Sequence, residues 1–119
     1  MLKIGYGNAV QLTRGDTAYL NVAITNDVDG AEYEMQDGDT LVFTMKKNVA
    51  DAPVIQKKIA GGTVFHIEPA DTAHLDDGKY KYDVVLTTAA GDVFTVVQAS
   101  VFEISVEVTS TRKLLGEVT

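Results

Sequence analysis

The stretch Asp76-Asp77-Gly78-Lys79-Tyr80-Lys81-Tyr82-Asp83-Val84-Val85-Leu86 decides the fold class of this chain. From residue 79 to 88, every second position is large and apolar: Tyr80, Tyr82, Val84 and Leu86. Side chains of a β-strand alternate between its two faces, so this spacing predicts a strand with one buried face. The Asp-Asp-Gly before it is typical of a tight turn.

The same alternation recurs on both sides of this stretch. It is clear in residues 17–26, 40–47 and 63–68, and weaker in residues 10–13, 54–59 and 93–108. Inside the last segment the apolar phase changes, which is what a β-bulge produces, and we expect a kink at residues 99–101. Residues 69–75 alone look helical, for one or two turns at most.

Two connections carry further signals. Pro53 precedes the segment 54–59, and Lys57 and Lys58 lie along it, which favours an edge strand that resists pairing with other molecules. Gly61-Gly62 then predicts a hairpin into the segment 63–68.

Seven short strands separated by regular turns predict an all-β, immunoglobulin-like β-sandwich of about seven antiparallel strands. Tyr80 is placed to form a tyrosine corner, in which the hydroxyl bonds back to the preceding backbone. Tyr82 then stands where antibody domains carry their second cysteine. We therefore expect Asp76, Gly78, Tyr80 and Tyr82 to be structural residues. The chain is expected to be one domain, residues 1–119, with a core in residues 10–109.

Composition excludes several classes of protein. The 119 residues have a formal net charge of −7 and no cysteine, so disulfide scaffolds, cysteine-based zinc sites and thiol nucleophiles are excluded. The clusters of basic residues are only short pairs, which disfavours nucleic acid and anionic membranes as partners. No apolar run is long enough to span a bilayer, and the N-terminus does not resemble a signal peptide. We expect a protein made in the cytoplasm that needs no cofactor.

Several motifs together resemble a known family. They are Gly15-Asp16-Thr17, Leu41-x-Phe43-x-Met45, Leu75-x-x-Gly78-x-Tyr80-x-Tyr82-Asp83-Val84-x-Leu86, Gly91-Asp92-x-x-Thr95 and Phe102-x-Ile104-x-Val106-x-Val108-Thr109. The pattern resembles the N-terminal immunoglobulin-like domain of phage baseplate upper proteins, found in phages and prophages of Gram-positive bacteria. The resemblance implies a virion structural protein of the tail or baseplate, which contacts other tail proteins and can form a homo-oligomer within the assembly.

The sequence offers little for catalysis. A hydrolase triad needs serine, histidine and aspartate within hydrogen-bond reach of one another. The histidines are His66 and His74, whereas the serines, Ser100, Ser105 and Ser110, all follow in the last strand and tail. We expect no enzymatic activity and no catalytic residues.

The acidic segment 27–39 holds the one candidate metal site. Asp27, Asp29, Asp37 and Asp39 could supply oxygen ligands for calcium, but the bidentate glutamate of an EF-hand loop is missing. Aspartate and glycine are also what turns require, so a solvated loop is the favoured interpretation. The same loop could instead dock onto a basic partner.

Three other features each have two interpretations. Arg14-Gly15-Asp16 matches the integrin tripeptide, but a tight turn is favoured. Tyr6, Tyr19 and Tyr33 could stack on sugars, which makes a carbohydrate- or cell-surface-binding module the alternative function; scattered surface aromatics are ordinary, however. The tail, residues 110–119, is either frayed or packs on a neighbouring subunit.

Overall fold

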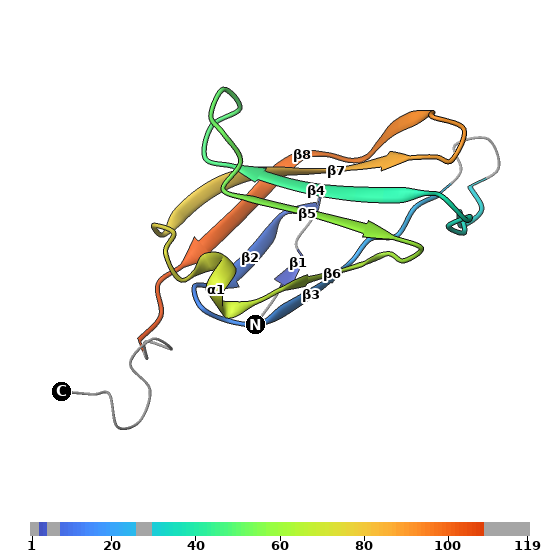
Figure 1. Ribbon diagram of the computed structural model, residues 1–119. Helices are drawn as coiled ribbons and strands as arrows, with labels where there is room; N and C mark the ends of the chain where they lie inside the picture. Colours follow the sequence, from blue (N-terminus) through green and yellow to red (C-terminus); the bar gives the residue numbers. More distant parts are fainter. Residues whose placement is uncertain (1–2, 5–7, 26–29, 109–119) are drawn as a thin grey trace.

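The computed structural model describes residues 3–4, 8–25 and 30–108 of the chain. The elements there are β1 (Lys3–Ile4), β2 (Val10–Thr13), β3 (Ala18–Asn21), β4 (Thr40–Lys46), β5 (Ile55–Ala60), β6 (Val64–Ile67), α1 (Pro69–Thr72), β7 (Gly78–Thr87) and β8 (Val93–Ser105) (Figure 1). The described chain is therefore mostly β, with one short helical turn. Each of the seven longer strands lies in its predicted segment or one residue outside it, whereas the two-residue β1 was not predicted.

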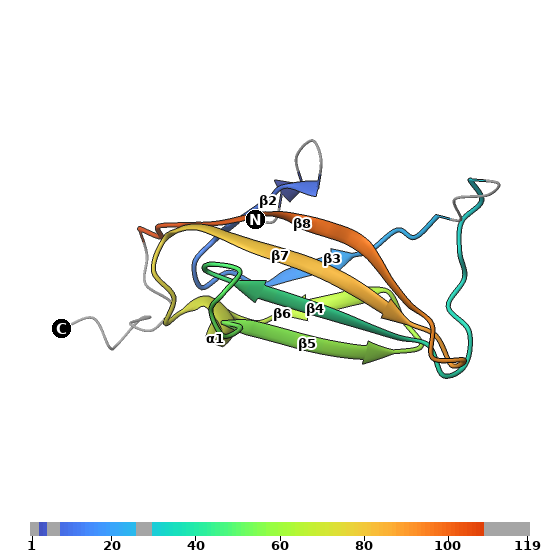
Figure 2. The ribbon, with the colours of Figure 1, turned by 90° about the horizontal axis from the view of Figure 1, so that it is seen from above.

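Six strands form one curled sheet in the order β1-β2-β8-β7-β4-β5. Neighbours are antiparallel except β2 and β8, which run parallel with Val10 opposite Phe102 and Thr13 opposite Ser105. The prediction of antiparallel pairing throughout is thus wrong for this pair. Alternation could not reveal it, because a strand buries the same face whichever way its neighbour runs. Figure 2 shows β2 beside only part of the long strand β8.

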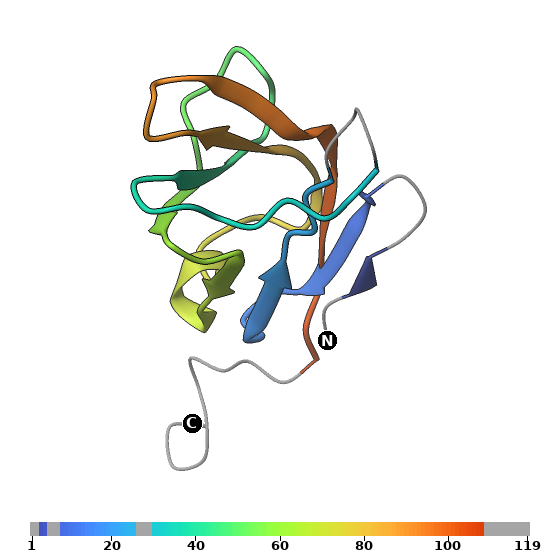
Figure 3. The ribbon, with the colours of Figure 1, turned by 90° about the vertical axis from the view of Figure 1, so that its right-hand side faces the viewer.

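β3 and β6 form a separate, two-stranded antiparallel sheet, with Ala18 opposite Ile67 and Asn21 opposite Val64. Figure 3 looks along the strands and shows this pair facing the curled sheet across the interior. The predicted hairpin at Gly61-Gly62 is wrong, because this turn leads from β5 in one sheet to β6 in the other. The crossing places Phe65 of β6 in the core, where it is fully buried.

The core lies between the two sheets, and its centre is aromatic. The ring of Phe43 on β4 lies 5.7 Å from that of Phe65 and 5.4 Å from that of Tyr82. Tyr82 meets Phe102 edge to face at 5.7 Å. Such pairs add stabilisation beyond the area they bury, and Phe43 joins strands from both sheets. Around them pack Val10, Leu12, Ala18, Leu20, Val22, Ile24, Leu41, Met45, Ile55, Ile67, Leu75, Tyr80, Val84, Leu86 and Ile104.

β8 carries the expected irregularity, though not only where it was predicted. Tyr82 pairs with Ser100 and Val85 pairs with Thr95, so β8 advances five residues while β7 advances three. Two bulges therefore lie between Thr95 and Ser100, mostly before the predicted kink at residues 99–101. They separate a buried C-terminal half of β8 from an N-terminal half in which Val93 and Phe94 are exposed.

The helical turn α1 is tied to the edge of the curled sheet. The backbone N–H of Glu68 donates to the Asp71 carboxylate at 2.7 Å, which caps the turn. Lys57 of β5 pairs with the same carboxylate at 2.8 Å. The predicted edge position of this strand is confirmed, since β5 ends the sheet. No helix in the described part of the chain is long and apolar enough to cross a membrane.

Candidate functional site: the β3–β8 groove

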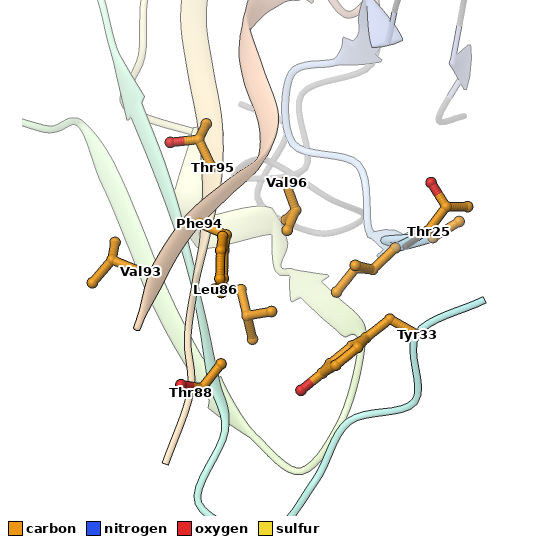
Figure 4. A pocket seen from close by; sticks show the side chains of 10 residues that line it. Thr25, Tyr33, Leu86, Thr88, Val93, Phe94, Thr95 and Val96 are labelled. Carbon is orange, nitrogen blue, oxygen red and sulfur yellow. The ribbon is translucent and has the colours of Figure 1, made fainter. Parts of the chain in front are cut away.

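A hollow lined by about equal parts of polar and apolar surface opens between the two sheets. It has a volume of about 600 Å³ and is lined by Ala23, Ile24, Thr25, Tyr33, Leu86, Thr88, Val93, Phe94, Thr95 and Val96 (Figure 4). A second hollow of about 250 Å³ shares Ala23 and Val96 with it and is completed by Asn8, Leu20, Asn21, Val22, Tyr82, Val84 and Val97. Both follow the seam between residues 20–25 and residues 93–97, which we call the β3–β8 groove.

The groove opens because the strands bordering it are unequal in length. β2 covers one edge of β8 only from Phe102 to Ser105. From Val93 to Val97, β8 has β7 on one side and no described strand on the other. Phe94 pairs with the buried Leu86 and so belongs to the inner face, yet 53% of its surface is exposed. An inward-facing aromatic ring with that much exposure shows that the space between the two sheets is incompletely closed here.

The charges around the groove are all of one sign. The described segments that border it, residues 20–25, 30–39 and 86–96, contain no lysine, arginine or histidine. Four exposed carboxylates belong to them: Glu32, Glu34, Asp37 and Asp92. A partly apolar lining, on segments whose charged residues are all acidic, suits a ligand that has apolar groups and carries positive charge.

Asp39 fastens the loop at one end of the groove. Its buried carboxylate accepts hydrogen bonds from the Tyr33 hydroxyl, the Gln36 N–H at 2.9 Å and the Ala89 N–H at 3.1 Å. The bonds from Tyr33, Gln36 and Ala89 outweigh burial and hold the pKa of Asp39 below its ordinary value. The bond to Asp39, reinforced by burial, raises the pKa of Tyr33. The Tyr33 ring is thereby fixed as a wall of the groove.

Gly38 brings that loop against the turn between β7 and β8. Its φ is +88°, and a Cβ at this position would lie 2.7 Å from the Cβ of Ala89. Only glycine permits both the backbone conformation and the approach. The sequence showed the acidic loop, but not that it packs on a turn fifty residues later.

This arrangement gives Asp39 a role other than the calcium ligand considered above. Both carboxylate oxygens of Asp39 already accept hydrogen bonds from the protein. Asp37, two residues earlier, is exposed. Asp27 and Asp29 lie outside the described residues. Among the residues that are described, no three or more of His, Cys, Asp and Glu gather in a way that could hold a metal ion.

Tyr80 makes the bond expected of a tyrosine corner. Its hydroxyl donates to the backbone oxygen of Asp76 at 2.8 Å, and the Lys47 ammonium lies 4.7 Å from its ring centroid. Burial, with Asp76 and Asp77 adding to it, raises the pKa of Tyr80. Gly78 has a φ of +134° at the start of β7, which a residue with a side chain would rarely adopt.

Tyr82 also serves the structure. Its ring packs between Phe43 and Phe102, and its hydroxyl donates to the backbone oxygen of Asn8. Burial raises the pKa of Tyr82. The bond holds the segment that precedes β2 against the body of the domain.

Arg14-Gly15-Asp16 forms the turn between β2 and β3. The Arg14 guanidinium makes a bidentate ion pair with Glu107, with a shortest contact of 2.8 Å, and donates to the Leu75 carbonyl at 3.0 Å. The Gly15 N–H donates to the Thr72 hydroxyl at 2.8 Å, and Gly15 has a φ of +84°. With its arginine occupied in this way, the tripeptide acts as a structural turn. Nothing in the sequence pattern indicated that Glu107 is the partner of Arg14.

The histidines and serines lie in different parts of the molecule. His66 is on the outer face of β6 in the small sheet, and His74 is exposed after α1. Ser100 and Ser105 belong to β8 in the large sheet, where the Ser105 hydroxyl accepts a hydrogen bond from Gln11. Ser110 lies outside the described residues. The described side chains thus assemble no serine–histidine pair.

Tyr19 and Tyr33, the two described tyrosines of the predicted sugar platform, do not share a surface. Tyr19 is 63% exposed on the outer face of β3 and stacks on His66 with ring centroids 4.6 Å apart. Tyr33, by contrast, is half-buried and lines the groove between the two sheets. Tyr6 and the tail, residues 110–119, lie outside the described residues.

Comparison with known proteins gives no relative from which a function could be transferred. No protein-family model, no curated protein and no solved structure matches the chain. The candidate site therefore rests on its own geometry: a partly apolar groove, on segments whose charged residues are all acidic, beside the half of a long strand that no described strand covers.

Proposed function

We propose that this chain is a non-enzymatic docking module with an immunoglobulin-like fold, which holds parts of a phage or prophage tail together by protein–protein contact. The strand order supports the fold assignment. Five strands, β2-β8-β7-β4-β5, match the sheet of a variable-type immunoglobulin domain, and β3-β6 match the central pair of the opposite sheet. The Tyr80 hydroxyl bond to Asp76 supports it further.

The observation that carries the docking role is the β3–β8 groove. The groove is a concave surface between the two sheets, and it offers apolar side chains such as Ile24, Leu86 and Phe94 to a partner that covers it. The described lining of the groove contains no convergent nucleophile, base or metal ligands. The groove is therefore suited to binding by surface contact. Placement in a tail follows from the resemblance to baseplate upper proteins and stays a proposal.

Localisation in induced particles tests this function. Phage or prophage particles from the organism that carries the gene would be purified, and the protein sought by mass spectrometry and by immunogold labelling. We expect label on the tail or baseplate, with particles from a strain lacking the gene as the control. Recovery of the protein only with the bacterial cell surface would contradict the tail assignment.

Carbohydrate binding remains the second candidate, favoured by one observation. The Tyr19 ring is exposed and held flat by His66, with one face available for stacking on a sugar. A glycan array compares the wild-type protein with Tyr19→Ala. Binding that is lost in Tyr19→Ala but kept in Phe94→Ala would place sugar recognition on the outer face of β3 and β6, away from the groove.

A further inference from the structure

Beside the groove, the backbone of β8 has hydrogen-bonding groups that no described strand pairs with. The Thr88 N–H donates to the Asp92 carbonyl at 2.8 Å, so these two residues form a hydrogen-bonded pair. Antiparallel ladders alternate between bonded and non-bonded pairs. Thr87–Val93 and Val85–Thr95 are therefore non-bonded pairs, and the backbone groups of Val93 and Thr95 point away from β7. That direction is the edge which β2 does not reach.

The opposite side of the groove is also a strand edge. β3 pairs with β6 on one side only. Beyond β3, the Val22 N–H and the Ile24 carbonyl bond to Thr63 and Tyr33, on the same side as β6. The groove thus lies between two edges that no described strand occupies. It runs along residues 20–25 and 93–97, a span that a short strand could occupy.

The groove also defines what such a strand would contact. Neighbouring strands lie about 4.8 Å apart, so a segment bonded to β8 would lie directly over the hollow. Every second side chain would then point toward Ile24, Leu86 and Phe94, and the others toward solvent. The occupant must therefore be extended and must alternate between apolar and polar residues.

The charge of the segments that line the groove further restricts which sequence could bind there. The segments that line the groove also carry the exposed carboxylates of Glu32, Glu34, Asp37 and Asp92, which favour lysine or arginine at the polar positions and flanks of the occupant. They also disfavour a second copy of this chain, because two copies joined at β8 would bring two acidic borders together. The net charge of −7 adds to that repulsion.

We propose that the β3–β8 groove binds an extended segment of a partner protein as an added strand, paired with Val93–Val97 of β8, with apolar side chains in the groove and basic side chains along its border. Strand addition of this kind takes affinity from main-chain bonds and selectivity from alternate side-chain pockets. The inference rests on the docking function proposed above and names its site and the chemistry of its partner.

Peptide selection tests the proposal without any phage component. Random twelve-residue peptides displayed on a surface would be selected on the wild-type protein, and binding of the synthetic peptides measured by fluorescence anisotropy. We expect sequences that alternate apolar residues with lysine or arginine, and affinity that falls as salt rises. Selection of no peptide, or only of acidic ones, would overturn the proposal.

Protein variants locate the bound peptide. Thr95→Pro removes an edge N–H without touching the β7 ladder and should weaken binding by about tenfold or more. Thr95→Val keeps the N–H and serves as the matched control. Phe94→Ala should also weaken binding, whereas Tyr19→Ala, which removes another exposed ring from the outer face of β3, should not. Equal binding to Thr95→Pro and Thr95→Val would overturn strand addition.

Peptide variants keep the test decisive if Thr95→Pro fails to fold. Peptides N-methylated at alternate residues would be compared in the two possible phases. One phase removes the N–H groups that face β8 and should abolish binding; the other leaves them and should retain it. Equal effects of both phases would exclude a paired strand. Dimerisation of the protein in light scattering, lost in Thr95→Pro, would instead identify a second copy as the occupant.

The two proposals can fail separately. A tail protein that selects no basic, alternating peptide keeps its docking function and loses this groove as the site. A protein that binds such peptides through Thr95 but is absent from phage particles keeps the groove and loses the tail assignment.

Discussion

At the scale of single residues, several side chains that could have served a chemical function instead make structural hydrogen bonds. Arg14, Asp39, Tyr80 and Tyr82 each bond to a segment remote in sequence or to a turn. Each therefore holds a loop or end onto the two sheets. A substitution that removes one of these hydrogen bonds should lower the stability of the protein without altering its fold.

Tyr80→Phe is the simplest such replacement. It removes the hydroxyl bond to Asp76 but keeps the buried ring, so we expect a loss of about 0.5–1.5 kcal/mol in the free energy of unfolding. Urea denaturation followed by circular dichroism measures it. Tyr19→Phe, on an exposed ring, serves as the control, and an equal loss in both variants would contradict a tyrosine corner.

Asp39 should make stability depend on pH at the acid end. Its hydrogen bonds from Tyr33, Gln36 and Ala89 lower its pKa, so the folded protein favours the charged form. This stabilisation is complete above about pH 4, the ordinary carboxyl range, and is lost as the pH falls through the lowered pKa. Asp39→Asn should flatten the fall in melting temperature between neutral and acid pH. An unchanged slope would show that the carboxylate is not the titrating group.

At the scale of the elements, contact between the sheets is concentrated on Phe43. Phe43→Ala removes a fully buried ring that touches Phe65, Tyr82 and Phe102, and should cost about 3–5 kcal/mol. Phe94→Ala, on a ring that is 53% exposed, should stay within about 1 kcal/mol of the wild type. Urea titration of both variants checks the pair. A large loss in Phe94→Ala would mean that this ring belongs to the core rather than to a binding groove.

Much of the element structure was accessible from the sequence because alternation reports burial directly. The predicted inner faces of residues 40–47 and 79–88 are the buried ones, including Leu41 and Leu86. Alternation does not report the partner of a strand. It could not show that β2 pairs parallel with β8, nor that Gly61-Gly62 leads into the other sheet.

The groove itself was hidden for a related reason. Residues 93–97 belong to a segment that the sequence predicted only as a strand, because a sequence pattern assumes that every apolar face finds a cover. Whether it does depends on the length of the strands opposite. The one available signal was the excess of apolar residues at positions 93–97, where both faces of the strand are apolar.

At the scale of the whole molecule, protection of the backbone should follow the same asymmetry. The Phe102–Ser105 part of β8 lies between β2 and β7, whereas Val93 and Thr95 face an uncovered edge. In native-state hydrogen exchange we expect the amides of Val93 and Thr95 to exchange much faster than those of residues 102–105. Amide-resolved exchange by NMR measures this. Slow exchange at both Val93 and Thr95 would mean that another segment already covers the edge.

The parallel pairing of β2 with β8 has a mechanical consequence. Tension applied to the chain before Val10 and after Ser105 pulls these two strands in opposite directions along their length. The hydrogen bonds between the two strands are then loaded in shear and must break at the same time. An antiparallel pair pulled from adjacent ends instead unzips one bond at a time. A domain built this way suits an assembly that must transmit pulling forces without coming apart, and stretching single molecules from both ends would reveal its resistance.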